Sequence, residues 1–385
     1  MEASDLTSSE FWSSTQPWVI PNPRDSVAVA EAEIIQPWLE QQAGLQGHLL
    51  FRTSGSTGKG KWVALSRSAL LASARAVNEF LQVTPNDRWL LTLPLFHVGG
   101  FGIAARSYLA GCLMLQGESS WDAERCYDRL CEESITLTSL VPAQLGDLVG
   151  LGRSAPPSLR AVLIGGGRTD DSIYQQAVEL GWPVHETYGM TETASQVATA
   201  PTGGRQLQIL PHWQVGTDEH QLLKFQGEAL FSAYVGCDQG RCFIDDPKQD
   251  GWFISSDRGE VASGILTVMG RADRCVKVLG ELVDLSEVES TLKRVADEAG
   301  LSQRELIVTA VQPPKAGEYR DQRRGTLLVL CTDQDDGLAS LLEKYNAVCP
   351  ALQRIKGIAV LGEIPRTAIG KIDYPLIQQL LQSDQ

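Results

Sequence analysis

The stretch ITLTSLVPAQLGDLVGLGRSAPPSLRAVLIGGGRTDDSIYQQAVELGWPVHETYG, residues 135–189, alternates short apolar runs with segments of helical periodicity. We predict strands in ITLTSLV, LRAVLIGGG and PVHETYG, and helices in PAQLGDLVG and DSIYQQAVELG. Repeated strand–helix units imply a parallel sheet that is covered by helices on both faces. In such sheets ligands bind beyond the carboxyl ends of the strands, where the glycine-rich clusters of this sequence fall.

The same alternation extends toward the N-terminus. Strands are predicted in HLLFRTS, KWVALS, DRWLLTLPLF and CLMLQG. A helix is predicted within residues 25–50, with an interruption at Pro37, and further helices in RSALLASARAVNEFLQV, in residues 102–111 and in WDAERCYDRLCEES.

The C-terminal half has a different pattern of predicted secondary structure. Residues 205–270 carry short strands separated by turns, which predicts a small, mostly antiparallel β unit. A compact segment of mixed helices and strands follows. Because 385 residues exceed what one hydrophobic core usually serves, we predict an α/β fold with two domains. A large N-terminal domain would span 1–270 and a small α+β domain 274–385, with the boundary at 271–273.

Composition limits the classes of partner. The formal net charge is −14, from 47 acidic and 33 basic residues, which argues against nucleic acid and anionic lipid. The start of the sequence resembles no secretory signal, and no apolar run reaches the roughly 18 residues of a membrane span. Eight scattered cysteines without a C-x-x-C pair predict reduced thiols. We therefore expect a cytoplasmic protein that binds small molecules.

The segment TSGSTGKGK, residues 53–61, combines glycines, hydroxyls and lysines, a composition that suits contact with phosphate oxygens. Gly55, Gly60 and Lys61 have the spacing of a P-loop. However, Trp62 occupies the position of the hydroxyl that binds Mg²⁺ in that motif, and a strand-like WVALS follows where a P-loop opens a helix. A P-loop nucleoside triphosphatase and a flexible surface turn remain the alternatives for this segment alone.

Four further motifs follow in order: YGMTET (188–193), SSDRGEV (255–261), GRADRCVKVLGELVDLSEVE (270–289) and PRTAIGKID (365–373). Together with residues 53–61 they resemble the motifs of the acyl-adenylate-forming superfamily, which includes acyl- and aryl-CoA synthetases and peptide-synthetase adenylation domains. The resemblance implies an acid–thiol ligase that uses ATP, Mg²⁺ and coenzyme A, with no tightly bound prosthetic group. It also implies that the C-terminal domain is mobile.

The resemblance assigns an ATP site. Thr191 would touch phosphate, Glu192 would hold Mg²⁺ and Tyr188 would stack on adenine. Asp257 would accept the ribose hydroxyls and Arg271 would contact ribose or phosphate, a surface salt bridge being the alternative for both. The residues expected to bind ATP or AMP are Thr53, Ser54, Gly55, Ser56, Thr57, Gly58, Lys61, Gly165, Gly166, Gly167, Tyr188, Gly189, Asp257 and Arg271.

By the same resemblance, Lys371 bridges the carboxylate and the α-phosphate during adenylation. Asp273 would be the hinge about which the C-terminal domain rotates between the two half-reactions. The loop KVLGE, with Lys277, Gly280 and Glu281, would then replace Lys371 in the site.

The segment LPLFHVGGFGIAARSYLAG, residues 93–111, resembles the o-succinylbenzoate–CoA ligase branch, which acts in menaquinone and phylloquinone synthesis. That acid carries an aromatic carboxylate besides the one that reacts, and a buried carboxylate needs a cation. Arg106 is the expected partner, with an arginine on the solvent face of its helix as the alternative. The other residues expected around the acyl group are His97, Gly99, Gly100 and Ser195, with Gln196 beside them.

One departure concerns the 52 residues before the phosphate loop, since family members usually have a much longer segment there. The large domain is therefore expected to be shortened at its N-terminus, and a homodimer would cover the exposed sheet. Two alternatives to the leading interpretation stay open. One is a ligase for another aryl or acyl group, and the other is an adenylate-forming protein without transfer to coenzyme A.

Overall fold

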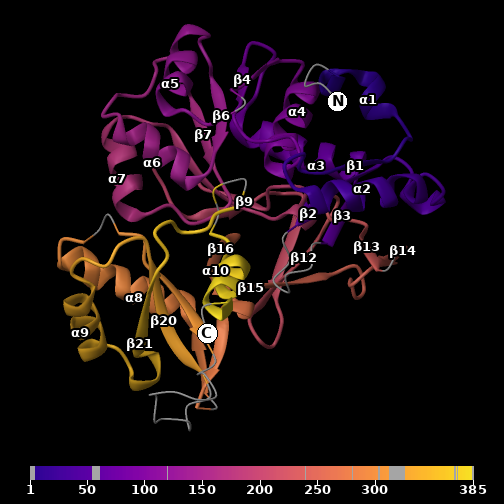
Figure 1. Cartoon of the computed structure of the whole chain (residues 1–385). Coiled ribbons are helices and arrows are strands. Elements are labelled where there is room, and N and C mark those ends of the chain that lie inside the picture. The colour runs from indigo at the N-terminus through magenta and orange to yellow at the C-terminus, as the bar shows by residue number, and fades with distance from the viewer. Residues whose placement is uncertain are drawn as a thin grey trace. The chain divides into compact units, whose positions relative to one another are not determined.

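A computed structural model describes residues 5–53, 61–118, 120–238, 240–279, 281–301, 304–311, 326–367, 370 and 372–383 (Figure 1). The chain divides into two compact units. The N-terminal unit comprises Met1–Ser255 and Gly259–Thr267, and the C-terminal unit comprises Ser256–Arg258 and Val268–Gln385.

The parallel strands at one end of the larger sheet of the N-terminal unit confirm the predicted α/β fold (Figure 1). Its five strands lie in the order β8-β7-β6-β4-β5, and all neighbours are parallel. Every residue of β6 and β7 is buried, as expected for strands covered on both faces. The strands are β4 (Arg88–Leu91), β5 (Leu113–Gln116), β6 (Leu137–Leu140), β7 (Ala161–Ile164) and β8 (Val184–Tyr188). The helices between and before them are α3 (Arg67–Leu81), α4 (Val98–Ala110), α5 (Ala123–Glu132), α6 (Pro142–Gly150) and α7 (Asp171–Glu179).

Antiparallel strands extend this sheet to eleven, in the order β11-β12-β15-β16-β10-β9-β8-β7-β6-β4-β5. The added strands are β9 (Ala198–Thr199), β10 (Leu207–Ile209), β11 (Trp213–Thr217), β12 (Leu222–Gly227), β15 (Phe253–Ala262) and β16 (Ile265–Arg271). The predicted β-rich segment thus supplies antiparallel pairs, such as β11 with β12, to the edge of the parallel sheet.

A second sheet has the order β1-β2-β3-β13-β14. Its strands are β1 (Trp18–Ile20), β2 (His48–Thr53), β3 (Lys61–Ser66), β13 (Ala233–Asp238) and β14 (Arg241–Asp245). Helix α2 (Ser26–Leu39) packs on it through a buried cluster that includes Ile35, Leu50 and Trp62. The predicted interruption at Pro37 is wrong, because α2 continues to Leu39. Pro37 lies in the last turn of α2. It has no backbone N–H to donate, but the helix still continues for two more residues.

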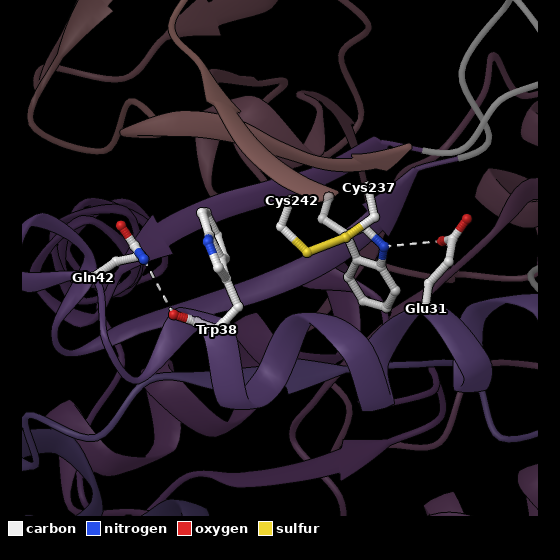
Figure 2. Close-up of a disulfide and its surroundings, with 6 residues drawn as sticks. Glu31, Trp38, Gln42, Cys237 and Cys242 are labelled. Atoms are coloured by element: carbon white, nitrogen blue, oxygen red, sulfur yellow. Dashed lines mark hydrogen bonds between the residues drawn. A yellow bond between two sulfur atoms is a disulfide. The ribbon is translucent and has the colours of Figure 1, made fainter. Parts of the chain in front are cut away.

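The expectation of eight reduced cysteines is also wrong. Cys237 and Cys242 face each other across the β13–β14 hairpin and form a disulfide, while the other six cysteines are free. Residues paired directly in an antiparallel ladder approach closely, and here the Cα atoms are 4.2 Å apart. Figure 2 shows the disulfide above α2, beside the ring of Trp38.

The C-terminal unit has the predicted α+β composition, and its own core contains Val288, Leu292, Leu330 and Tyr345. In its three-stranded sheet, β20 lies between antiparallel β19 and parallel β21. Its elements are β17 (Cys275–Val278), β18 (Glu281–Asp284), α8 (Leu285–Glu298), β19 (Ile307–Val311), β20 (Leu327–Thr332), α9 (Leu338–Val348), β21 (Ile355–Val360) and α10 (Tyr374–Ser383).

Within the residues that the structure describes, no helix combines the length and apolar character needed to cross a membrane.

Candidate active site

The loops that follow β7 and β8 lie side by side, because these strands are parallel neighbours. Gly165, the first residue after β7, lies so close to Thr187 that an added Cβ would be 2.9 Å from the threonine hydroxyl. A Cβ on Gly189 would lie 1.7 Å from the carbonyl oxygen of Ser195, so only glycine fits there. Gly165 thus leaves room for the Thr187 side chain, and Gly189 lets the loop after β8 fold closely onto itself.

The loop after β8 has an uncommon backbone. Ala194 and Ser195 have φ values of 50° and 96°, in the left-handed region that non-glycine residues rarely adopt. The Trp213 indole donates to the Gln196 carbonyl oxygen at 3.0 Å and fixes the end of the loop. Strained residues held in this way often belong to functional sites. The motif YGMTET and Ser195 thus lie on one closely constrained loop.

Arg106 projects from α4 into the protein and is only 2% exposed. Its Nη2 donates to Oε1 of Gln196 at 2.8 Å, and the guanidinium lies 5.6 Å from the ring centre of Trp89. In the described part of the chain, Nε of Arg106 has no hydrogen-bond partner and no carboxylate forms an ion pair with the side chain. Burial lowers the pKa of Arg106 to about 10. The solvent-facing alternative for this arginine is therefore wrong.

Gly102 connects Arg106 with Ser195. The Cβ position of Gly102 is 3.2 Å from Nη2 of Arg106 and 3.8 Å from Cβ of Ser195. The structure thus brings together two residues that were predicted to contact the acyl group. His97 is the N-cap residue of the same helix. Its ring packs against that of Phe96, with 4.7 Å between the ring centres.

The two glycines after His97 differ in their surroundings. A Cβ on Gly100 would lie 2.4 Å from the carbonyl oxygen of Pro94, so the close approach of two backbones by itself requires glycine there. A Cβ on Gly99 would make an ordinary contact of 3.4 Å with the Leu93 side chain. Their contact with an acyl group stays a prediction.

Glu192 lies in a short 3₁₀ turn, Thr191–Thr193, directly after β8. Its carboxylate accepts a hydrogen bond of 2.9 Å from the Tyr234 hydroxyl. In the described ranges, no group of three or more His, Cys, Asp or Glu residues could hold a metal ion by itself. Mg²⁺ bound to nucleotide phosphates usually takes only one or two carboxylates from the protein. A single carboxylate at Glu192 fits an ion of that kind.

Thr53 and Lys61 are paired residues at the ends of β2 and β3, so the two ends of the predicted phosphate loop are adjacent. Seven predicted site residues lie outside the described residues. They are Ser54, Gly55, Ser56, Thr57, Gly58, Gly280 and Lys371.

The C-terminal unit contains a second group of predicted residues. Arg271 forms two hydrogen bonds with Asp273, of 2.8 and 2.6 Å, and a third of 3.3 Å with Asp257. The predicted ribose, phosphate and hinge residues therefore form one ion cluster, in agreement with the salt-bridge alternative. Lys277 and Glu281 lie on β17 and β18 of the neighbouring hairpin and are exposed.

Sequence reasoning missed Tyr234 and Trp89. Tyr234 lies 42 positions from Glu192 and outside all five motifs. Trp89 lies in β4, whose apolar sequence is typical of any buried strand. Neither residue carries a signal in a single sequence, because their contacts arise from pairing between distant segments.

Comparison with known proteins agrees with these features. The sequence profile of a family described as AMP-binding enzyme matches residues 40–217. Indoleacetate–CoA ligase from Aromatoleum aromaticum is 31% identical over 371 residues, which cover 89% of this chain and 69% of that protein. A 2-succinylbenzoate–CoA ligase from Bacillus cereus is 39% identical over 367 residues, covering 86% and 69%.

A similar solved structure is an arginine-to-lysine variant of Escherichia coli MenE with bound OSB-AMS. It superposes with a TM-score of 0.71 at 27% identity, covering 88% of this chain and 69% of that chain. The chain thus matches just over two thirds of the length of each of these three proteins.

Proposed function

This chain belongs to the AMP-binding enzymes, the acyl-adenylate-forming ligases that join acids to coenzyme A, and we propose that it is an o-succinylbenzoate–CoA ligase. In the first half-reaction the succinyl carboxylate would attack the α-phosphorus of ATP, which forms an acyl-adenylate and releases pyrophosphate. In the second, the thiol of coenzyme A would displace AMP. The product would be a precursor of menaquinone or phylloquinone.

The observation that carries this proposal is the environment of Arg106. A buried guanidinium costs free energy unless it is paired, and its one hydrogen-bond partner among the described side chains is the neutral amide of Gln196. The aromatic carboxylate of o-succinylbenzoate would supply the missing negative charge. Ser195 lies near the same guanidinium and would line the acyl group.

On the nucleotide side, the adjacent ends of the phosphate loop and the carboxylate of Glu192 support binding of Mg²⁺ and ATP. The ion would neutralise charge that develops on the phosphates. The assignment of Lys371 to adenylation, and of Asp273, Lys277, Gly280 and Glu281 to a rotation of the C-terminal domain, is part of the proposal by family resemblance. A cytoplasmic location is also part of it, because ATP and coenzyme A are available there.

The test is the rate of pyrophosphate release with o-succinylbenzoate and with benzoate, for the wild type and for Arg106→Ala. The wild type should prefer the dicarboxylate. The variant should lose about 100-fold in kcat/KM for it, since removing one partner of a buried charge pair costs about 3 kcal/mol. Arg75→Ala, on the exposed face of α3, is the matched control and should leave both rates unchanged.

Equal rates of the wild type with both acids would contradict the o-succinylbenzoate assignment. A selective wild type together with an unchanged Arg106→Ala variant would contradict only the role of Arg106.

A second candidate is a ligase for an aryl monocarboxylate, which the similarity to an indoleacetate–CoA ligase favours. Indoleacetate has one carboxylate, which is consumed in the reaction, so Arg106 would have no anionic partner. Including indoleacetate in the substrate panel separates the two candidates. Acyl-adenylate formation without thioester production would instead indicate an adenylating protein that does not use coenzyme A.

A further inference from the structure

One short segment, residues 231–234, holds Glu192 at two points. The backbone N–H of Phe231 donates to the Glu192 carbonyl oxygen at 2.9 Å. The Tyr234 hydroxyl donates to Oε1 of the same residue, also at 2.9 Å. Residues 231–234, at the start of β13, therefore bind both the main chain and the carboxylate of Glu192.

The same tyrosine contacts the end of the phosphate loop. Tyr234 on β13 pairs with Val63 on β3, so Lys61, two residues before Val63, lies diagonally across on the same face of the sheet. The Lys61 ammonium is 4.7 Å from the centre of the Tyr234 ring, which is a cation–π distance. Tyr234 therefore touches both a predicted phosphate ligand and the predicted Mg²⁺ ligand.

Packing fixes the ring of Tyr234. Its centre lies 4.8 Å from that of Phe231 and 6.5 Å from that of Phe253, in tilted and edge-on arrangements. This packing holds the hydroxyl next to Oε1 of Glu192, to which it donates at 2.9 Å.

We propose that Tyr234 is a positioning residue for metal-bound ATP, whose hydroxyl holds the Glu192 carboxylate in the orientation that binds Mg²⁺. This inference rests on the proposed function, because it takes Glu192 as the Mg²⁺ ligand. A partner that orients a ligating carboxylate contributes about 10- to 100-fold to metal affinity. The ring contact with Lys61 fixes the ammonium at the end of the phosphate loop relative to that carboxylate.

The test compares binding of ATP to the full chain in Mg²⁺ and in EDTA, by calorimetry without any acid substrate. Tyr234→Phe keeps the ring and its contact with Lys61 but removes the hydroxyl. We expect this variant to bind Mg²⁺-ATP about tenfold more weakly than the wild type and metal-free ATP equally well. Tyr127→Phe is the matched control, because Tyr127 also donates a hydrogen bond, of 2.8 Å, to Ser154 in the same unit. It should change neither affinity.

If Tyr234→Phe binds both Mg²⁺-ATP and metal-free ATP as tightly as the wild type, the inference is overturned and the proposed function stays intact. Equal weakening of both would also overturn it, because that result indicates a general structural role. A wild type that binds ATP equally well with and without Mg²⁺ would overturn the role of Glu192, and the inference with it. Acid selectivity, measured separately, tests the proposed function.

Discussion

Arg106 and Arg271 are both predicted to contact a ligand, but their surroundings differ. Arg106 is buried in the N-terminal unit and bonds to a neutral amide. The Arg271 side chain is 51% exposed in the C-terminal unit and bonds to two carboxylates, Asp257 and Asp273. In the second region the protein supplies the compensating charge itself.

This difference shows when a motif arginine indicates a ligand and when it does not. An exposed, paired guanidinium is stable without a ligand, so its structure alone does not indicate one. A buried guanidinium with a neutral partner retains a net charge in a medium of low dielectric constant, which favours an anionic ligand. The N-terminal unit therefore gives the stronger argument for the chemistry of the acyl group.

The largest expected effect comes from making Arg106 resemble Arg271. Gln196→Glu would place a carboxylate beside the guanidinium and remove its need for an anionic substrate. We expect kcat/KM for o-succinylbenzoate to fall about 10- to 100-fold, which corresponds to one hydrogen bond to a charged group. Rates with a monocarboxylate should change little. Gln214→Glu, at an exposed position of β11, is the control. Unchanged selectivity would show that Arg106 does not recognise the second carboxylate.

An intermediate effect is expected at His212, a half-buried histidine, which can lose its charge within the pH range of the protein where an arginine cannot. In the described residues neither ring nitrogen has a partner, and burial lowers its pKa to about 4. Since the folded-state pKa lies below the unfolded value of 6.5, this contribution to stability is complete above pH 6.5 and is lost as the pH falls toward 4.

The free energy of unfolding should fall by about 2 kcal/mol between neutral pH and pH 4.5. This is less than the difference between the folded and unfolded pKa values of His212 implies, because the ring is partly exposed. Urea unfolding at pH 7.5 and 4.5 measures it. His212→Phe should have a smaller difference between the two pH values than the wild type. The buried histidines His48 and His185, whose pKa values burial also lowers, remain in both proteins. Identical differences would contradict the role of His212.

The smallest effect is expected from Arg271→Gln. Exposed ion pairs contribute about 0–1 kcal/mol, and salt screens them. We expect the free energy of unfolding to fall by less than about 1 kcal/mol, and by less still in high salt. Arg294→Gln, which removes an exposed pair with Glu298 on α8, is the matched control. A loss of several kcal/mol that salt does not reduce would mean that Arg271 has a structural role like that of a buried charge.

Much of the fold could be predicted because it rests on local patterns. The apolar runs of β6 and β7 and the helical periodicity of α6 and α7 are properties of adjacent residues, and they sufficed for the parallel sheet. The phosphate loop and YGMTET are likewise continuous segments.

The rest depends on which distant segments become neighbours. Gln196 reaches Arg106 across 90 positions, and β13 pairs with β3, far away in the sequence, while the preceding strand β12 belongs to the other sheet. A single sequence carries no record of such pairing. The helix through Pro37 was missed because the cost of a proline depends on its place within the helix.

The Cys237–Cys242 bond joins residues only five positions apart, within one hairpin. In the chain-entropy model so short a loop contributes about 2 kcal/mol, less than half of what a hundred-residue loop gives. Since the bond ties no distant segments together, the order of strands in either sheet does not depend on it. The architecture is therefore compatible with both an oxidising and a reducing environment, and the covalent constraint itself is confined to the β13–β14 hairpin.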